Sequence, residues 1–140
     1  MFLTRECDYG IRVVRNLADG TKKKVENIAE EEHIPQKYAY KIVKKLEKAG
    51  FIVSIRGRGG GCRLHRPLEN FTLVDIVLAI DPERFLNECL KKDSDCPFKI
   101  NTTDPCAVHH ELLRIQEVLL SEMSSKSLAT ILRLEAAYNV

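Results

Sequence analysis

Residues 34–61, 34-IPQKYAYKIVKKLEKAGFIVSIRGRGGG-61, join a basic amphipathic stretch to a glycine-rich hairpin. Between about residues 35 and 49, apolar side chains recur at helical spacing while lysines fill most other positions, which predicts a helix. Pro35 suits the first position of that helix, and Gly50 stands where helices commonly end. Residues 51–55 and 62–65 have the composition of two short strands joined by the tip RGRGGG. We therefore predict a basic helix followed by a two-stranded wing.

Two shorter helices are predicted upstream of this stretch. Residues 5–18 have a helical apolar spacing with Thr4 as a plausible cap, and residues 25–34 form a second segment. Helix, turn, basic helix and wing follow one another in the order of a winged helix-turn-helix. In that motif the second helix of the pair enters the DNA major groove, which is about 12 Å wide. The order predicts a unit that binds double-stranded DNA.

The predicted DNA contacts lie on the basic helix and at the wing tip. In the first half of the helix, Gln36, Lys37, Tyr38, Tyr40 and Lys41 are placed to reach bases or nearby phosphates, although Tyr38 suits the apolar core equally well. Lys44, Lys45 and Lys48 are placed for phosphates alone. At the tip, glycine permits close backbone approach and arginine fits a narrow negative groove, so Arg56 and Arg58 complete the set.

The charge of the chain divides into two halves. Residues 1–66 carry 15 lysines and arginines against 8 acidic residues, whereas residues 67–140 carry 7 against 12. A basic half joined to an acidic half is what one end that binds a polyanion would have, although the charge alone fits a solvated basic surface without a ligand equally well. No stretch approaches the roughly 20 apolar residues of a membrane span, and the N-terminus lacks the apolar run of a signal peptide. We expect a cytoplasmic protein without membrane association, where five cysteines are poor candidates for disulfides.

The acidic half begins with a helix over residues 71–81, where Thr72 and Asp75 resemble a capping pair. Residues 81–104 show no clean period, and a loop of this length usually has a function or is disordered. Asp104 and Pro105 resemble a helix start, and a helix to Ser124 would be about 30 Å long, followed by a short helix over residues 127–138. The expected organisation is a DNA-binding domain over 1–80, a cysteine-rich loop over 81–106, and a long helix with a C-terminal helix over 105–140.

Three of the five cysteines fall within or beside this loop. Cys89, Cys96 and Cys106 have the spacing C-x6-C-x9-C, and His109 follows Cys106 on the same face of the expected helix. Thiolates are soft ligands that suit an iron–sulfur cluster or zinc, and a helix N-terminus favours the thiolate form. Cys7, on an apolar stripe, and Cys62, in the wing, are left out of the expected metal site.

The chain resembles the Rrf (type two) family of bacterial transcription regulators. The resemblance rests on LTRECDYGIR near the start, on residues 34–61 and on TLVDIVLAID, and it spans essentially the whole chain. It implies a mainly α-helical fold with a small β-wing, in which a winged helix-turn-helix domain is followed by a long C-terminal dimerisation helix. It further implies a homodimer that binds a roughly palindromic site. We expect a repressor and not an enzyme, because no oxyanion hole or orienting acid accompanies Cys106 and His109.

In the family's iron–sulfur members, three cysteines occupy this region, although both gaps are wider here than usual. The resemblance therefore implies a cluster on Cys89, Cys96 and Cys106, with [4Fe–4S] preferred over [2Fe–2S], that senses nitric oxide, oxygen, redox state or iron supply. Two residues match a fourth ligand. Asp8 matches the acid that NsrR-like members supply from the partner subunit, and His109 matches the histidine of IscR-like members; we favour Asp8, which could otherwise pair with Arg12. A structural zinc site with His109, or a metal-free loop that binds a partner or effector, are the alternatives.

Overall fold

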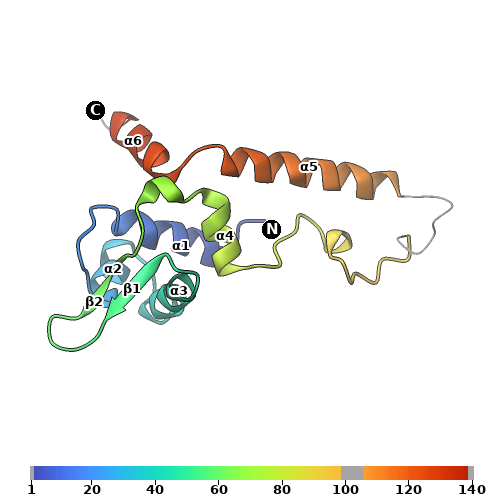
Figure 1. Ribbon diagram of the computed structural model, residues 1–140. Helices are drawn as coiled ribbons and strands as arrows, with labels where there is room; N and C mark the ends of the chain where they lie inside the picture. The colour runs from blue at the N-terminus through green and yellow to red at the C-terminus, as the bar shows by residue number, and fades with distance from the viewer. Residues whose placement is uncertain (1, 99–105, 139–140) are drawn as a thin grey trace.

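The computed structural model describes residues 2–98 and 106–138, without the side chains of 134–138 (Figure 1). Six helices and one hairpin make up this part of the chain: α1 (Arg5–Asn16), α2 (Val25–Glu31), α3 (Gln36–Lys48), β1 (Ile52–Ile55), β2 (Gly61–Leu64), α4 (Leu73–Ile80), α5 (Ala107–Ser124) and α6 (Leu128–Tyr138). Two short 3₁₀ helices, η1 (Leu68–Asn70) and η2 (Glu88–Leu90), precede and follow α4 in the sequence. This is the predicted mainly α-helical architecture with a small wing.

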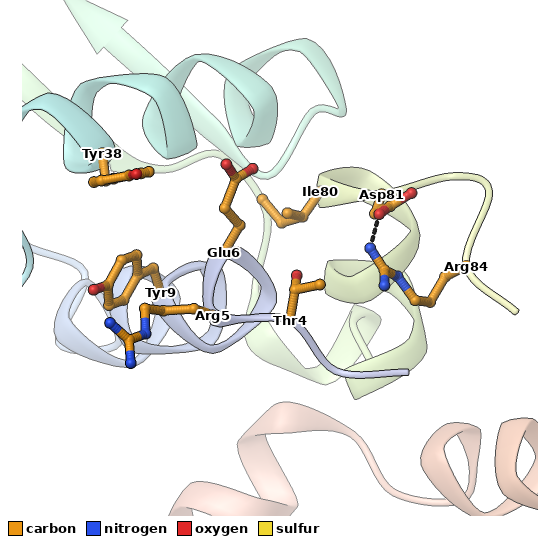
Figure 2. A pocket seen from close by; sticks show the side chains of 8 residues that line it. All are labelled: Thr4, Arg5, Glu6, Tyr9, Tyr38, Ile80, Asp81 and Arg84. Carbon is orange, nitrogen blue, oxygen red and sulfur yellow. Dashed lines mark ion pairs between the residues drawn. The ribbon is translucent and has the colours of Figure 1, made fainter. Parts of the chain in front are cut away.

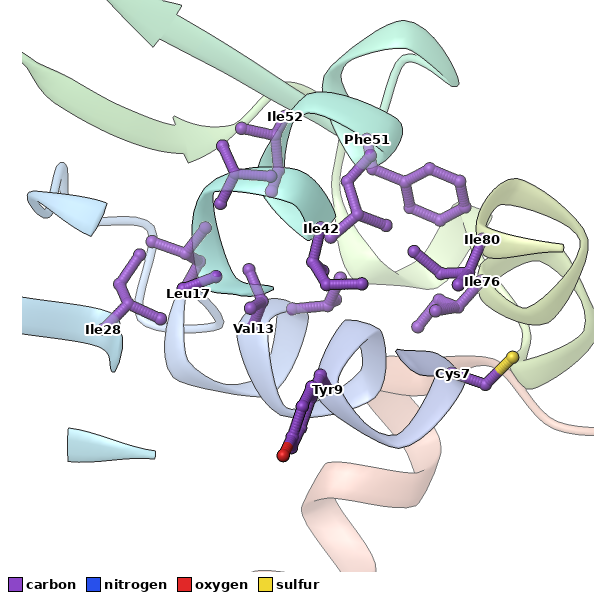
Figure 3. Packing of buried hydrophobic residues seen from close by; sticks show 14 of the residues in the cluster. Cys7, Tyr9, Val13, Leu17, Ile28, Ile42, Phe51, Ile52, Ile76 and Ile80 are labelled. Atoms are coloured by element: carbon purple, nitrogen blue, oxygen red, sulfur yellow. The ribbon is translucent and has the colours of Figure 1, made fainter. Parts of the chain in front are cut away.

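The first four helices and the hairpin share one core (Figure 3). Helix α3 buries Ala39, Ile42, Val43 and Leu46, and Ile42 and Leu46 are fully enclosed. Against them pack Val13 and Leu17 of α1, Ile28 of α2 and Ile76 of α4, all with side chains that water does not reach. The helical spacing in the sequence arises from this packing, because each helix turns one apolar stripe inward.

The wing is an antiparallel hairpin that a third segment extends. Ile52 pairs with Leu64 and Ile55 with Gly61 across β1 and β2. On the other edge of β2, Lys23 N–H donates to Cys62 O at 2.9 Å and Cys62 N–H donates to Lys23 O at 2.8 Å. A Cβ atom on Gly61 would lie 2.5 Å from Lys23 O, so this close approach requires glycine.

Helix α4 closes the core on the side opposite the wing. Thr72 accepts from the backbone N–H of Asp75, and Asp75 accepts from the backbone N–H of Thr72, so the predicted capping box is present. Gly10 of α1 lets the two helices meet, because a Cβ there would lie 2.9 Å from Ile80 Cγ1. Helix α4 therefore fixes where the following segment leaves the core.

Residues 81–98 lead away from the core, and α5 begins at that far end and runs back above them toward the core (Figure 1). The chain then returns to the core at α6, where Leu128 is buried and its N–H donates to Phe71 O at 2.7 Å. No helix among the described residues is long and apolar enough to cross a lipid bilayer.

Several predicted boundaries are wrong by a few residues. Helix α1 ends at Asn16 and α2 at Glu31, and Pro35 caps α3 in an extended conformation and does not open its first turn. Likewise, Cys106 is the N-cap of α5 and not a first-turn residue. The predicted helix start at Asp104 and Pro105 lies outside the described residues.

Candidate nucleic-acid interface and cysteine segment

The outer face of α3 presents most of the residues that the sequence assigned to base or phosphate contacts, but Lys45 is half-buried and bonded within the chain, contrary to the prediction. Gln36, Lys37, Tyr38, Tyr40, Lys41 and Lys44 are all exposed. The choice that the sequence left open for Tyr38 is settled, because the side chain is 44% exposed and Ala39 takes the inward position beside it. A helix that buries one stripe and leaves a polar basic stripe free is suited to enter a DNA groove.

Two lysines of α3 are already bound within the chain. Lys41 Nζ lies 2.5 Å from Glu6 Oε1, and Lys45 Nζ lies 3.0 Å from Glu6 Oε2 and 2.9 Å from Ile80 O. The hydrogen bonds from Lys41 and Lys45 hold the pKa of Glu6 below its usual value. Lys44, by contrast, is exposed and makes no ion pair with any described side chain, so its ammonium group is the freer of the three.

Tyr40 is held by a carboxylate of the neighbouring helix. Its hydroxyl donates to Glu26 Oε1 of α2. This hydrogen bond raises the pKa of Tyr40 and lowers that of Glu26. Because both side chains lie at the surface beside α3, the pair fixes the tyrosine ring at the edge of the expected interface.

A groove of about 600 Å³ separates α3 from the wing. Lys44, Arg56 and Arg58, which the sequence predicted as DNA ligands, line it together with Lys24. Lys24 was missed, although the run 22-KKK-24 in the sequence was a visible signal. The middle lysine of that run is bonded within the chain, because Lys23 Nζ donates to Asn16 O at 2.9 Å. Glu26 and Glu47 also line the groove, so its four cations outnumber its carboxylates, and a net positive groove between a helix and an arginine tip suits a phosphate backbone.

The glycines of the tip have a second role that the sequence did not indicate. A Cβ on Gly60 would lie 2.4 Å from Ile55 O and 2.8 Å from Gly57 O. The tip therefore needs glycine to close on itself, whether or not DNA is near. Arg56 and Arg58 stand exposed on this tight loop.

A family model described as "Rrf2: Iron-dependent Transcriptional regulator" matches residues 3–134. The chain belongs to the Rrf2 family. It is 30% identical over 115 residues to protein aau3 of Rhizobium meliloti (strain 1021), covering 80% of this chain and 72% of that protein.

The solved structures confirm the Rrf2 fold at lower identity. T. potens IscR superposes with a TM-score of 0.71 at 22% identity, covering 93% of this chain and 85% of that one. The oxidised form of Staphylococcus aureus CymR superposes with a TM-score of 0.69 at 22% identity, covering 91% and 92%. Rrf2 proteins are DNA-binding transcription regulators and not enzymes, as the sequence predicted. The winged helix-turn-helix of this chain is thus its DNA-binding unit.

The three cysteines of the expected metal site lie on two segments that pack together. Cys89 belongs to η2, Cys96 follows it, and Cys106 caps α5; all three are partly exposed. Leu86 N–H donates to the buried Gln116 Oε1 at 2.9 Å, which joins the segment before η2 to α5. Within residues 2–98 and 106–138, however, no three Cys, His, Asp or Glu side chains are grouped closely enough to hold a metal ion.

The two candidates for a fourth ligand have different surroundings. Asp8 is exposed on α1 and forms an ion pair with Arg12 at 2.9 Å, one turn further along the helix. His109 is partly exposed, with its ring edge-on to His110 at 5.8 Å between centroids. Cys7 and Cys62 are buried, and burial raises the pKa of the Cys62 thiol to about 11, which suits a structural cysteine.

A pocket of about 430 Å³ lies between the DNA-binding core and the start of the cysteine segment at residues 81–84 (Figure 2). Tyr9 of α1 and Tyr38 of α3 stand on one side with ring centroids 6.0 Å apart. On the other side, Arg84 forms an ion pair with Asp81 at the end of α4. Glu6, which holds the two lysines of α3, lines the same pocket. Helix α3 and the start of the cysteine segment therefore line the same pocket.

Proposed function

We propose that the protein is a homodimeric Rrf2 repressor whose DNA affinity is controlled by an iron–sulfur cluster held by Cys89, Cys96 and Cys106. The observation that carries the proposal is the placement of three accessible thiols on two mutually packed segments of an Rrf2 chain. Soft thiolates are the donors that such clusters require. When bound, the cluster supplies an iron centre reactive toward nitric oxide, oxygen or redox change, with [4Fe–4S] preferred to [2Fe–2S].

The donor chemistry fits the group, and the described conformation leaves the thiols apart. Loading therefore requires the cysteine segment to close toward the start of α5. Because the thiols lie outside the buried cluster of the first four helices and the hairpin, we expect such closure to leave the DNA-binding core intact.

A series of hydrogen bonds and ion pairs connects this segment to helix α3. Lys45 of α3 bonds Ile80 O, the last residue of α4, immediately before the Asp81–Arg84 ion pair that starts the segment. Lys45 and Lys41 also bond Glu6, two residues from Asp8 on α1. A displacement of residues 81–84, or of Asp8 when it bonds the cluster of the partner subunit, would shift α3. In a dimer whose half-sites are about 34 Å apart, a small shift weakens binding.

The dimer itself is proposed through α5. Val108, Ile115 and Val118 are 65%, 41% and 51% exposed on this helix, and they fall within one helical stripe. An exposed apolar stripe is stabilised when another surface buries it. The same stripe on a second copy of the helix is a self-complementary surface for that purpose. Replacing Ile115 and Val118 with glutamate should yield a monomer by analytical ultracentrifugation and weaken operator binding; a dimer that survives both changes would contradict this interface.

The central experiment is oxygen-free purification with iron and sulfide counting. We expect about four irons and four sulfides per chain with visible absorption, loss of both in Cys89→Ser, Cys96→Ser and Cys106→Ser, and a DNA affinity that changes at least tenfold after nitric oxide treatment. Metal-free protein, or an operator affinity that does not change when the metal is removed, would overturn the sensing role. The protein would then remain a DNA-binding regulator without a cluster.

The fourth ligand is tested with a matched pair of variants. Asp8→Asn removes the carboxylate, whereas Arg12→Gln keeps it and removes its ion-pair partner together with the hydrogen bond from Arg12 to Glu32 O. We expect Asp8→Asn to keep a visible chromophore and lose control over DNA affinity, with Arg12→Gln behaving as the parent. If His109→Ala has that effect and Asp8→Asn does not, His109 holds the position.

Two other uses of the segment are distinguished by the same preparation. Colourless protein with one zinc, lost together with Cys89, Cys96, Cys106 or His109, would indicate a structural tetrahedral site. Regulation that survives replacement of all three cysteines would indicate a metal-free effector or partner loop.

A further inference from the structure

A second hollow, on the opposite end of the DNA-binding core from the cysteine segment, is lined by cations. It has a volume of about 670 Å³ and lies between the end of α1, the chain that leaves β2, and α6. Arg63, His65, Arg66 and Arg133 line it, and Glu69 is the one acidic residue among its described lining side chains. This volume is within the range of small-molecule sites, about 300–1,000 Å³.

Among the described side chains, the three arginines of this hollow have no carboxylate ion-pair partner. Arg63, Arg66 and Arg133 make no ion pair with any carboxylate among the described side chains, whereas Arg12, Arg15, Arg84 and Arg114 each have one. Arg133 Nε donates to Ala129 O of its own helix at 3.2 Å, which leaves its terminal nitrogens available. Three arginines that line one hollow with Glu69 as the one described carboxylate give it an excess of positive charge, which a bound anion would offset.

The walls between the arginines are apolar and firmly placed. Leu64, Pro67, Ala129 and Leu132 contribute carbon surface. Helix α6 is anchored beside them by the bridge between Thr72 and Ser127 and by the buried Leu128. The hollow shares no lining residue with the groove between α3 and the wing, so it is separate from the DNA-facing surface.

We propose that this hollow binds a small organic anion, a phosphate ester or carboxylate with an apolar body. The arginines hold the anionic group in charge-assisted hydrogen bonds, and Leu64 and Leu132 cover the body. Such a ligand would connect α6 to the strand that carries the wing. The proposal depends on neither a cluster nor a dimer.

The test uses phenyl phosphate as the probe, with inorganic phosphate and benzyl alcohol as partial probes, titrated into the purified full chain. Backbone amide shifts in ¹H–¹⁵N spectra should move at residues 63–69 and 129–133 with phenyl phosphate, less with inorganic phosphate, and not with benzyl alcohol. Arg66→Gln and Arg133→Gln should each weaken phenyl phosphate about tenfold, which corresponds to one charged hydrogen bond. Arg114→Gln on α5 is the matched control and should bind as the parent, and Arg66→Lys should retain partial affinity.

Three results would overturn the proposal. The first is an absence of shifts in this hollow, and the second is equal binding by the parent and both glutamine variants. The third is movement of the same amides by operator DNA while phenyl phosphate leaves them unchanged, which would assign the arginines to the DNA backbone. A circular dichroism spectrum identical to the parent's confirms that each variant is folded.

Discussion

The DNA-binding core and the cysteine segment with α5 use their apolar residues in opposite ways. Between Phe2 and Ile80 the helices bury most of their large aliphatic side chains, although Leu78 is 43% exposed. From Asp81 to Ser124, the described residues bury only Leu90 and Gln116, while Phe98, Val108, Ile115 and Val118 remain exposed. The first region is held by its own packing, and the second presents groups that suit a metal and a second copy. The DNA-binding core is thus held together by its own packing, and the contacts that we propose with a metal and a second copy fall in the region that is not.

The largest expected effect compares one isoleucine from each region. Ile42→Ala removes a side chain that water does not reach and should lower the free energy of unfolding by about 2–4 kcal/mol. Ile115→Ala removes one that is 41% exposed and should change stability by less than about 1 kcal/mol at low protein concentration. Urea denaturation at two protein concentrations measures both. Equal losses at the low concentration would show that α5 is packed within a single chain.

The second prediction concerns how rigidly the wing is built. Gly61→Ala places a methyl group 2.5 Å from Lys23 O and should cost about 1–3 kcal/mol, with loss of the Lys23–Cys62 bridge. Amide hydrogen exchange at Lys23 and Cys62 measures this bridge directly. Gly57→Ala, which meets no atom within 4 Å, is the control for the strain of a positive φ alone. If Gly57→Ala costs as much as Gly61→Ala, backbone conformation and not crowding explains the glycines.

A third prediction separates the charges of the two regions. Lys44→Gln should make the dependence of log K on log salt for operator binding shallower by about 0.9, the value for one phosphate contact. Lys126→Gln, an exposed lysine in the turn after α5, should leave the slope unchanged. Fluorescence anisotropy across a salt series measures both slopes. Equal slopes in Lys44→Gln and the parent would remove Lys44 from the interface.

The smallest effect is expected at Glu6, which connects α1 to α3. Its pKa is lowered in the folded chain by hydrogen bonds from Lys41 and Lys45, so the stabilisation is fully present above the unfolded pKa near 4.5 and is lost as the pH falls through the folded value. Because Glu6 is partly exposed, we expect about 0.5 kcal/mol. The free energy of unfolding of Glu6→Gln should therefore vary less with pH below about 4.5 than that of the parent. Indistinguishable pH profiles would contradict the role of this ion pair.

The sequence alone determined the features that depend on neighbours within a few positions. The helices α1, α3 and α4, the capping box of Thr72 and Asp75, and the hairpin around the glycine tip follow from apolar spacing and local turn chemistry. These sequence patterns predict the structure correctly because a helix stripe and a helix cap depend on residues three or four positions apart. The resemblance in residues 34–61 also led to the Rrf2 family.

Only the tertiary structure decided which charges remain free and which groups meet. Glu6 binds Lys41 and Lys45 across 35 and 39 positions of sequence, and Arg63, Arg66 and Arg133 come together only when α6 returns to the wing. Tyr38 turned outward because Ala39 filled the inward position. Such contacts depend on the angles at which helices cross, and spacing along one chain does not encode those angles in any local pattern. The partly exposed thiols and the apolar stripe of α5 likewise show no local pattern that reveals their contacts, because the partners we propose for them lie outside their own segment.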